Sequence, residues 1–494
     1  MSFYILTIDQ GTSSTRALVF SREYRLLAKA QLPLPSAYPH EGWVEQAPEI
    51  IWKDALSVAN EALRSAGVHA SQVAGLSISN QRETTIIWDR KTGEPIYPAI
   101  VWQDRRTLDQ CSAWADQGLN DMVQSKTGLL LDPYFSASKI RWILDNVPDA
   151  RDRANRGELA FGTIDTFLVW KLTSGKSHVT DMTNASRTML YNIHTFEWDQ
   201  QLLEAFDIPM SILPEVKPNV ADFGEVDAAH LGAAMPIVAM AGDQQAATVG
   251  QACFLPGMMK ATFGTGCFML LNTGKTPLVS KNRLLTTLAY HVGDEMAYAL
   301  EGSVFVAGAA VQWLRDAMKL IRSSQESEQW AVHTQDTQGV YFVPAFSGLG
   351  APYWDAQARG AILGLTHDSG IGHIVRAALE SVCYSVKDLW LAMEADGAQL
   401  ATLRVDGGMT QNDWLMQFLS NMLDAPVERA AQMETTALGV AFLAGLKLGW
   451  FHSLADIARL WELGERFDTR MESAEREKLY AGWVAAVSKI RTKS

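Results

Sequence analysis

The segment FYILTIDQGTSSTRALVF, from Phe3 to Phe20, is the part of the chain that most constrains its fold. Two apolar runs, Tyr4–Ile8 and Ala17–Phe20, flank a polar turn with the sequence DQGTSS at positions 9–14. Short apolar runs on both sides of a glycine-bearing turn predict two buried strands joined as a hairpin. An ordinary glycine turn between edge strands would give the same local pattern, so this hairpin alone does not decide a function.

The tip of the hairpin carries groups that suit a phosphate ligand. Gly11 lets the backbone approach a ligand closely. The three hydroxyl residues that follow it, Thr12, Ser13 and Ser14, can donate hydrogen bonds to phosphate oxygens. Asp9, at the end of the first strand, is placed to hold a Mg²⁺ ion that offsets phosphate charge.

A second segment repeats this pattern in the other half of the chain. MMKATFGTGCFMLLN, from Met258 to Asn272, again consists of an apolar run, a Gly-Thr-Gly tip and a second apolar run. The two tips, at Gly11 and Gly264, lie about half the chain apart. Two similar phosphate-binding hairpins, one in each half, predict a duplicated fold that closes on a nucleotide.

The length of the chain agrees with two domains. Its 494 residues exceed what one hydrophobic core usually supports. We therefore expect an N-terminal domain over residues 1–250 and a C-terminal domain over residues 251–494, with the boundary near Gly250–Gly257.

Charge and cysteine content restrict the partners and the compartment. The net charge of −13 argues against a nucleic acid or an acidic membrane, because either would need a basic face, but it leaves room for a polyphosphate ligand. The cysteines are widely spaced and form no Cys-x-x-Cys motif: Cys111, Cys253, Cys267 and Cys383. They predict reduced thiols. With no signal segment and no apolar run of spanning length, we expect a cytoplasmic protein that does not insert into membranes.

Polar clusters follow three of the expected strands. The strand Val73–Ser79 ends in NQRET at 80–84, Pro236–Ala241 ends in GDQQ at 242–245, and Leu403–Val405 ends in DGGMTQN at 406–412. Ligand sites in open α/β sheets lie at the carboxyl ends of strands, so these clusters are candidate parts of one site.

Each cluster also has a purely structural interpretation. Arg82 and Glu83 could form a solvated surface ion pair, and Asp243 could simply stabilise the start of the helix that follows it. The glycine pair at 407–408 could be a plain turn. Tyr134 is either a core ring or a hydroxyl directed into a cleft.

Helical periodicity is clearest in two segments. Apolar residues recur at helical spacing over Pro48–Ala66 and over Ile371–Ala395. We also expect a long helix within Ala297–Leu320, with Gly308 and Gln312 one turn apart on one face.

Taken together, these segments resemble the FGGY carbohydrate kinases, which have the actin-like, ribonuclease-H-like ATPase fold. The resemblance extends over nearly the whole chain and rests on DQGTSSTRA (9–17), SNQRETTIIWD (79–89), AIVWQDRRT (99–107), YFSASKIRWILDN (134–146), GDQQAA (242–247), FGTGCFMLLNTG (263–274), GAILGLTHDSGIGHIVRAALE (360–380) and DGGMTQND (406–413). QRET together with WQDRR is typical of the branch that acts on glycerol. The resemblance implies a two-domain α/β fold with its active site in the cleft between the domains.

It also implies the reaction and the residues that carry it. The expected reaction is ATP-dependent, Mg²⁺-assisted, in-line phosphorylation of glycerol to sn-glycerol 3-phosphate. Asp243 would be the general base and, with Asp9, would position Mg²⁺. The substrate-binding residues would be Arg82, Glu83, Trp102, Tyr134, Asp243, Gln244 and Phe268. The β- and γ-phosphates would contact Thr12, Ser13, Ser14, Arg16, Thr265 and Gly266, and the adenosine side would contact Gly308, Gln312, Gly408 and Asn412. A homodimer or homotetramer is expected.

Three other functions are compatible with parts of the pattern. A kinase of another polyol or ketose would keep the hairpins and vary the segment 80–106. An actin-like or chaperone-like ATPase would need no cluster for a small substrate. A nucleotide sensor without turnover is disfavoured because Asp243 is present.

Overall fold

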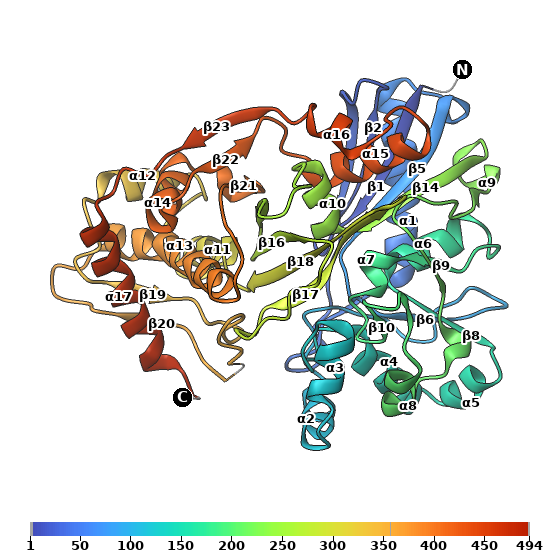
Figure 1. Ribbon diagram of the computed structural model, residues 1–494, viewed down its shortest axis with the longest axis horizontal. Coiled ribbons are helices and arrows are strands. Elements are labelled where there is room, and N and C mark those ends of the chain that lie inside the picture. Colours follow the sequence, from blue (N-terminus) through green and yellow to red (C-terminus); the bar gives the residue numbers. More distant parts are fainter. Residues whose placement is uncertain (1–2, 356, 493–494) are drawn as a thin grey trace.

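The computed structural model describes residues 3–355 and 357–492, which form two halves, each built around a mixed β-sheet (Figure 1). The sheet of the N-terminal half has the strand order β13-β14-β5-β1-β2-β3. Its strands are β1 (Tyr4–Gln10), β2 (Ser14–Phe20), β3 (Leu26–Pro33), β5 (Val73–Asn80), β13 (Glu225–Val226) and β14 (Met235–Gly242). The sheet of the C-terminal half has the order β17-β18-β16-β15-β21-β22-β23. Its strands are β15 (Met259–Phe263), β16 (Cys267–Gly274), β17 (Leu285–Val292), β18 (Glu295–Val304), β21 (Leu403–Asp406), β22 (Val427–Ala430) and β23 (Leu463–Phe467).

The two sheets share the arrangement of their central strands, and the C-terminal sheet has one additional edge strand, β17. In the N-terminal half β1 pairs antiparallel with β2 and parallel with β5, and β5 pairs parallel with β14. In the C-terminal half β15 pairs antiparallel with β16 and parallel with β21, and β21 pairs parallel with β22. Each sheet adds an antiparallel strand beyond the hairpin, β3 or β18, and another at the far parallel edge, β13 or β23. The expected duplicated, two-domain α/β fold is confirmed.

Two long helices follow the periodicity of the sequence. Helix α1 (Pro48–Ala66) begins with Pro48 and ends at Gly67, which adopts a left-handed conformation with φ 65°. Its apolar stripe, which includes Ile51, Ala55 and Val58, is buried in the N-terminal core with β1 and β2. Helix α13 (Ile371–Ala395) likewise lies in the core of the C-terminal half. Both elements have the bounds that the sequence predicts.

The expectation of a long helix within Ala297–Leu320 is wrong in its first part. The segment begins inside strand β18, and the helix, α11 (Gly308–Asp316), covers only nine residues. Strand β18 pairs with β16 on one side and β17 on the other, so its apolar residues are buried by the sheet. A short apolar run does not distinguish a buried strand from a buried helix.

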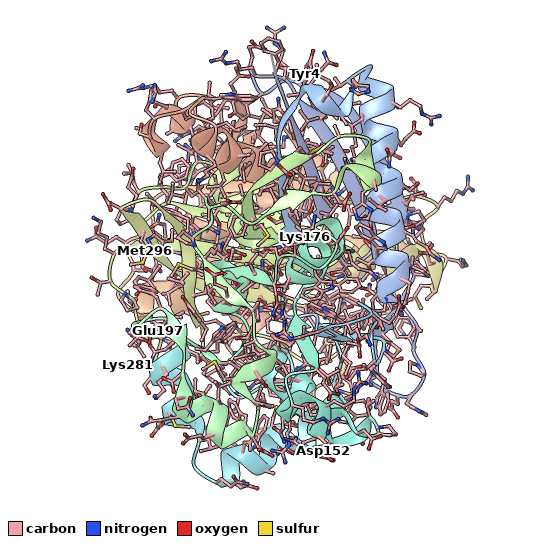
Figure 2. The ribbon with its side chains drawn as sticks, turned by 90° about the vertical axis from the view of Figure 1, so that its right-hand side faces the viewer. Tyr4, Asp152, Lys176, Glu197, Lys281 and Met296 are labelled. Carbon is pink, nitrogen blue, oxygen red and sulfur yellow. The ribbon has the colours of Figure 1, made fainter. Side chains whose placement is uncertain are left out.

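Other elements complete the two halves. The remaining helices are α2 (Leu108–Asp116), α3 (Asn120–Thr127), α4 (Ser136–Asn146), α5 (Ala150–Asn155), α6 (Ile164–Leu172), α7 (Met182–Ala185), α8 (Gln200–Phe206), α9 (Ala228–Leu231), α10 (Asp243–Gly250), α12 (Glu326–His333), α14 (Asp413–Leu423), α15 (Thr435–Lys447), α16 (Leu454–Ala458) and α17 (Ser473–Ile490). Short strands form small accessory sheets: β4 (Glu45–Gln46), β6 (Ile86–Asp89), β7 (Ala99–Ile100), β8 (Leu159–Gly162), β9 (Val179–Asp181), β10 (Tyr191–Asn192), β11 (Glu197–Trp198), β12 (Glu215–Lys217), β19 (Tyr341–Val343) and β20 (Ala361–Leu363). Tyr4 of β1 and Asp152 of α5 lie at opposite ends of the N-terminal half (Figure 2). Within the described ranges, no helix combines the length and hydropathy needed to span a bilayer.

Helix α15 connects the two halves, because it belongs to the C-terminal part of the chain and packs on the N-terminal sheet. Residues of α15 share one hydrophobic core with β1, β14 and α10. At the crossing of α10 and α15 the backbones come so close that a Cβ atom at Gly250 would collide with the carbonyl of Thr435. A Cβ atom at Gly439 would collide with the carbonyl of Ala246. Glycine is therefore required on both helices at this contact.

Candidate functional site

The first hairpin presents its polar tip at the end of strands β1 and β2. The turn is closed by a hydrogen bond from Gly11 N to Ser14 O of 2.9 Å. Asp9 and Arg16 are opposite each other in the register, and their side chains form an ion pair of 2.6 Å between Arg16 Nη2 and Asp9 Oδ2. Burial raises the pKa of the Asp9 carboxyl, and Arg16 opposes this rise. Apart from this ion pair, neither Asp9 oxygen has a hydrogen-bond partner within the described residues.

The second hairpin has a tighter turn at the corresponding place and also contacts a helix. Gly264 N donates to Gly266 O at 2.9 Å. The carbonyls of Gly264 and Thr265 accept hydrogen bonds from Gly308 N and Ala309 N, both at 3.0 Å, at the first turn of α11. A Cβ at Gly308 would lie 2.6 Å from Gly264 O, so the absence of a side chain allows the hairpin tip and helix to meet.

A cavity of about 400 Å³ lies between the two hairpin tips. Residues from both halves line it, as the expected interdomain site requires. It brings together nine of the residues that the sequence indicates: Thr12, Ser13, Ser14, Arg16, Trp102, Gln244, Thr265, Gly266 and Phe268.

A second cavity, of about 540 Å³, lies within the C-terminal half. It gathers all four residues expected on the adenosine side, namely Gly308, Gln312, Gly408 and Asn412. Gly264 and Thr265 line both cavities, so the two are neighbours that meet at the second hairpin tip. This arrangement has room for an extended ligand with an aromatic base at one end and phosphates at the other.

Arg82 and Glu83 belong to a buried cluster of four charges and do not form a solvated surface pair. Arg82 donates to both oxygens of Glu301, at 2.6 and 2.9 Å, whereas its Nε lies 3.9 Å from Glu83 Oε1. Arg187 Nε donates to Glu83 at 2.6 Å, and Arg187 Nη2 donates to Glu301 at 2.9 Å. All four side chains are at most 2 % exposed. Glu83 also has a positive φ of 62°, which is costly for a non-glycine residue and is typical of functional sites.

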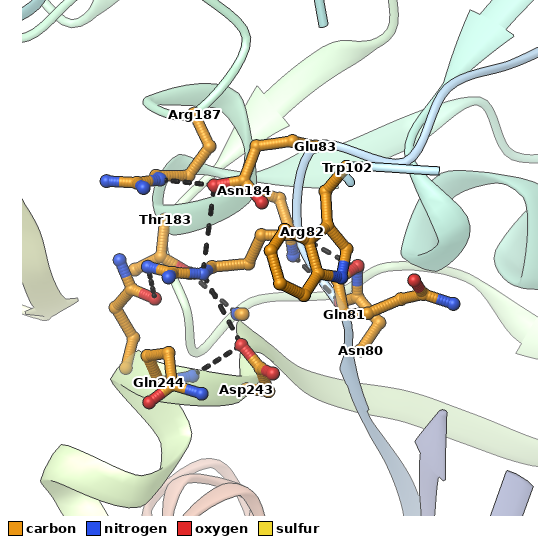
Figure 3. Close-up of polar contacts among 12 residues, drawn as sticks. Asn80, Gln81, Arg82, Glu83, Trp102, Thr183, Asn184, Arg187, Asp243 and Gln244 are labelled. Carbon is orange, nitrogen blue, oxygen red and sulfur yellow. Dashed lines mark hydrogen bonds and ion pairs between the residues drawn. The ribbon is translucent and has the colours of Figure 1, made fainter. Parts of the chain in front are cut away.

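Asp243 stands beside this cluster at the start of α10 (Figure 3). Its Oδ1 lies 3.4 Å from Arg82 Nε and accepts a hydrogen bond of 2.7 Å from Gln244 N. The N-cap of α10 is Gly242, so Asp243 does not act as the ordinary cap residue. Its side chain is 28 % exposed, unlike the four buried charges, and is therefore accessible to a ligand.

Three aromatic rings connect the cluster to the phosphate-side cavity. Trp102 packs against Tyr134 and Phe268, with ring centroids 5.5 and 5.8 Å apart. Trp102 Nε1 donates to Thr12 Oγ1 of the first hairpin at 2.9 Å. Tyr134 is only 2 % exposed, and burial raises the pKa of its hydroxyl well above the usual range. Arg82, Glu83 and Tyr134 are thus close to the cavity but do not line it in this arrangement.

Three charged residues of the site are not predicted from the sequence: Arg187, Glu301 and Lys260. Glu301 interrupts an apolar strand, which is a signal for a buried functional charge, but its partner Arg82 is 219 positions away. Arg187 follows the short helix α7 and has no recognisable pattern. Lys260 is fully buried on β15 next to Gln244.

The described residues contain no group of three or more histidine, cysteine or acidic side chains that could hold a metal by itself. Mg²⁺ commonly binds through one or two carboxylates together with substrate phosphates and water. Asp9, whose oxygens have no partner besides the Arg16 ion pair, and Asp243, which acts on it electrostatically, fit that requirement beside the cavity between the hairpins, whose lining includes Gly11 and Gln244 but neither carboxylate.

Known proteins resemble this chain over its full length. The models of the N-terminal and C-terminal domains of the FGGY family of carbohydrate kinases match residues 4–250 and 259–448. A glycerol kinase from Ectopseudomonas mendocina is 58% identical over 493 residues, and glycerol kinase 1 from Pseudomonas aeruginosa is 56% identical over 494 residues; each match covers 100% of both chains.

Two solved structures of carbohydrate kinases are similar to this chain over nearly its whole length. A Plasmodium falciparum glycerol kinase solved with ADP has a TM-score of 0.91 and 38% identity, covering 99% of this chain and 98% of the other. A xylulose kinase from Lactobacillus acidophilus has a TM-score of 0.89 at 21% identity, covering 99% of each chain, and shows the fold alone.

Proposed function

Because the chain belongs to the FGGY family of carbohydrate kinases, we propose that it catalyses the ATP-dependent phosphorylation of glycerol to sn-glycerol 3-phosphate. Glycerol is favoured as the substrate because the similar proteins from two pseudomonads, at 58% and 56% identity over the whole chain, are named glycerol kinases. The main structural support is the junction of the two cavities at Thr265, in a cavity that is also lined by Gln244, the residue that follows Asp243.

ATP would extend across the two cavities. The adenosine side would lie against Gly308, Gln312, Gly408 and Asn412, in the cavity of the C-terminal half. The β- and γ-phosphates would lie between the tips, where Thr12, Ser13, Ser14, Arg16, Thr265 and Gly266 line the cavity. Phosphoryl transfer needs positioning and neutralisation of charge more than covalent chemistry, and two hairpins with one arginine supply both.

Glycerol would bind where the polar cluster meets the aromatic rings. Arg82, Glu83, Tyr134, Asp243 and Gln244 would hydrogen-bond its hydroxyls, and Trp102 and Phe268 would pack against its carbon chain. Arg187 and Glu301 would act as positioning residues, because they hold Glu83 and Arg82 by direct hydrogen bonds. A substrate that lacks a hydroxyl would leave buried charges unsatisfied, which gives strong discrimination.

Asp243 would take the proton from the attacking primary hydroxyl. It is the accessible carboxylate next to the cluster, and a carboxylate base is adequate when the transition state is loose. Asp9 and Asp243 would hold Mg²⁺, which supplies charge neutralisation to the phosphates when bound. Arg16 would balance the charge of Asp9 and contact the phosphates.

A panel of possible substrates tests the proposed function. ADP formation is measured with glycerol, dihydroxyacetone, xylulose and no acceptor. We expect glycerol to give the highest kcat/KM and strong stimulation over the acceptor-free rate. A ketose preference would support another carbohydrate kinase, and acceptor-independent turnover would support an actin-like ATPase; either result contradicts the proposal.

Cytoplasmic location and homo-oligomeric assembly stay predictions.

The variant Asp243→Asn tests the base. We expect kcat to fall by about 10²–10⁴-fold, which is the usual contribution of general-base catalysis, with ATP-analogue binding nearly unchanged. Asp109→Asn, which removes an exposed carboxylate on α2, serves as the control. Near-full activity of Asp243→Asn would remove Asp243 from the mechanism.

A further inference from the structure

Two lysine side chains are fully buried among the residues that the structure describes, and they have different surroundings. Lys139 on α4 donates to the backbone carbonyls of Tyr134 and Phe135 at 2.7 and 3.0 Å. Lys260 on β15 instead contacts two side chains, Gln244 Oε1 through a short hydrogen bond and Thr262 Oγ1 at 3.0 Å. Lys139 therefore stabilises a backbone turn, whereas Lys260 holds side chains that line the cavity between the hairpins.

Lys260 has no carboxylate within ion-pair distance in the described part of the chain. Asp406 and Asp243 act on it only at longer range, and Asp406 accepts a hydrogen bond of 2.8 Å from Gln251. Burial lowers the pKa of the Lys260 ammonium, which expresses the cost of keeping this charge away from water. A well-packed apolar residue of similar size would avoid that cost, so a role in stability does not explain the lysine.

The ammonium group of Lys260 determines which atoms of Gln244 and Thr262 face it and which remain free to bind a ligand. An ammonium has three donors and no acceptor, so it directs the carbonyl oxygen of Gln244 toward itself and leaves the amide NH₂ to donate elsewhere. It also occupies an acceptor position of the Thr262 hydroxyl, whose proton then remains available to another acceptor. Both residues line the cavity, where a donor from Gln244 suits a glycerol hydroxyl and a donor from Thr262 suits a phosphate oxygen.

We propose that Lys260 is a positioning residue for phosphoryl transfer, which orients Gln244 and Thr262 as hydrogen-bond donors toward the cavity and contributes buried positive charge beside the transferred phosphate. Gln244 immediately follows Asp243 in the chain, and its backbone N–H binds the Asp243 carboxylate (Figure 3). Lys260 therefore links strand β15 of the second hairpin to Gln244, the residue that follows the proposed base Asp243. This proposal rests on the proposed kinase function.

The variant Lys260→Met tests the role, with Lys139→Met as the matched control for loss of a buried lysine. We expect Lys260→Met to lower kcat by about 10–100-fold, because Gln244 and Thr262 lose the charged donor that orients them, and to leave the KM for ATP within about threefold. We expect its thermal midpoint to change little, because the desolvation cost that methionine removes offsets the donor that Gln244 and Thr262 lose. Lys139→Met should instead lower the midpoint, because two backbone carbonyls lose their donor.

A double-mutant cycle with Gln244→Met identifies the route. If Lys260 acts through Gln244, the effects of Lys260→Met and Gln244→Met on kcat will be clearly less than additive. Full activity of Lys260→Met, or a loss of activity that only follows a loss of folded protein, would overturn the inference. Acceptor-dependent ADP formation by the unmodified chain is measured alongside, so that failure of the proposed kinase function is recognised separately.

Discussion

Arg82 forms a bidentate hydrogen bond with Glu301, while its Nε is directed toward Asp243 at 3.4 Å. The planar guanidinium thus contacts both Glu301, which holds it in place, and Asp243, the candidate base. Lysine carries the same charge but cannot reproduce this fork. We predict that Arg82→Lys raises the KM for glycerol by about 10–100-fold, the equivalent of one or two lost charge-assisted hydrogen bonds, and changes the KM for ATP by less than threefold. Steady-state kinetics with each substrate varied measure this; equal effects on both KM values would indicate a purely structural ion pair.

At the scale of single residues, the sequence predicts the site residues that belong to a local pattern. The hairpin tips and Gly408, in the turn after β21, line the two cavities because their positions follow from the local turn. Arg187, Glu301 and Lys260 could not be predicted, because their roles arise from partners that only the tertiary fold brings near; Arg187 and Glu301 are 114 positions apart. The same limit applies to Arg82, whose surface-pair interpretation is excluded by a partner on β18.

At the scale of elements, the contact between α10 and α15 controls where Asp243 stands, because Asp243 is the first residue of α10. Gly439 on α15 has no space for a side chain against the α10 backbone. We predict that Gly439→Ala lowers the free energy of unfolding by about 1–3 kcal/mol or more, the usual cost of overpacking, and reduces kcat in the folded fraction. Lys447→Ala, an exposed change on the same helix, should stay within about 0.5 kcal/mol. Chemical denaturation and kinetics compare the two; a neutral Gly439→Ala would mean that the helices separate easily.

Elements differ in how far their sequences determine them. Helices α1 and α13 are long enough for an apolar stripe to repeat over several turns, so their bounds follow from periodicity. Strand β18 is apolar because neighbouring elements cover it. A strand that is buried on both faces shows no alternation of apolar and polar residues, so its sequence does not distinguish it from a buried helix. The position of α15 across the other half is also decided by tertiary packing, since its sequence indicates only a buried helix.

At the scale of the whole molecule, the duplicated topology places one phosphate hairpin in each half, so neither half alone encloses the cavity between them. Helix α15 and the hydrogen bonds between Arg82 and Glu301 connect the halves near the base of this cavity. A further connection, from Glu434 to Arg16 at 3.1 Å and to Lys29 at 2.5 Å, joins the start of α15 to strands β2 and β3. Motion of the outer parts of the halves about this connected base is therefore the expected way to admit and enclose ligands.

We predict that a non-hydrolysable ATP analogue and glycerol together reduce the radius of gyration of the protein in small-angle scattering. The adenosine-side cavity belongs to the C-terminal half, whereas the polar cluster lies mainly on the N-terminal half, so the two ligands together contact more of both halves than either ligand alone. Glycerol alone should have a smaller effect, because it would contact the second hairpin only through Phe268 and would not reach the adenosine-side cavity. Arg16→Gln, which removes the cation from the first hairpin, should weaken the compaction at a fixed analogue concentration. An unchanged scattering profile at saturation of both ligands would mean that the two halves are already closed in solution.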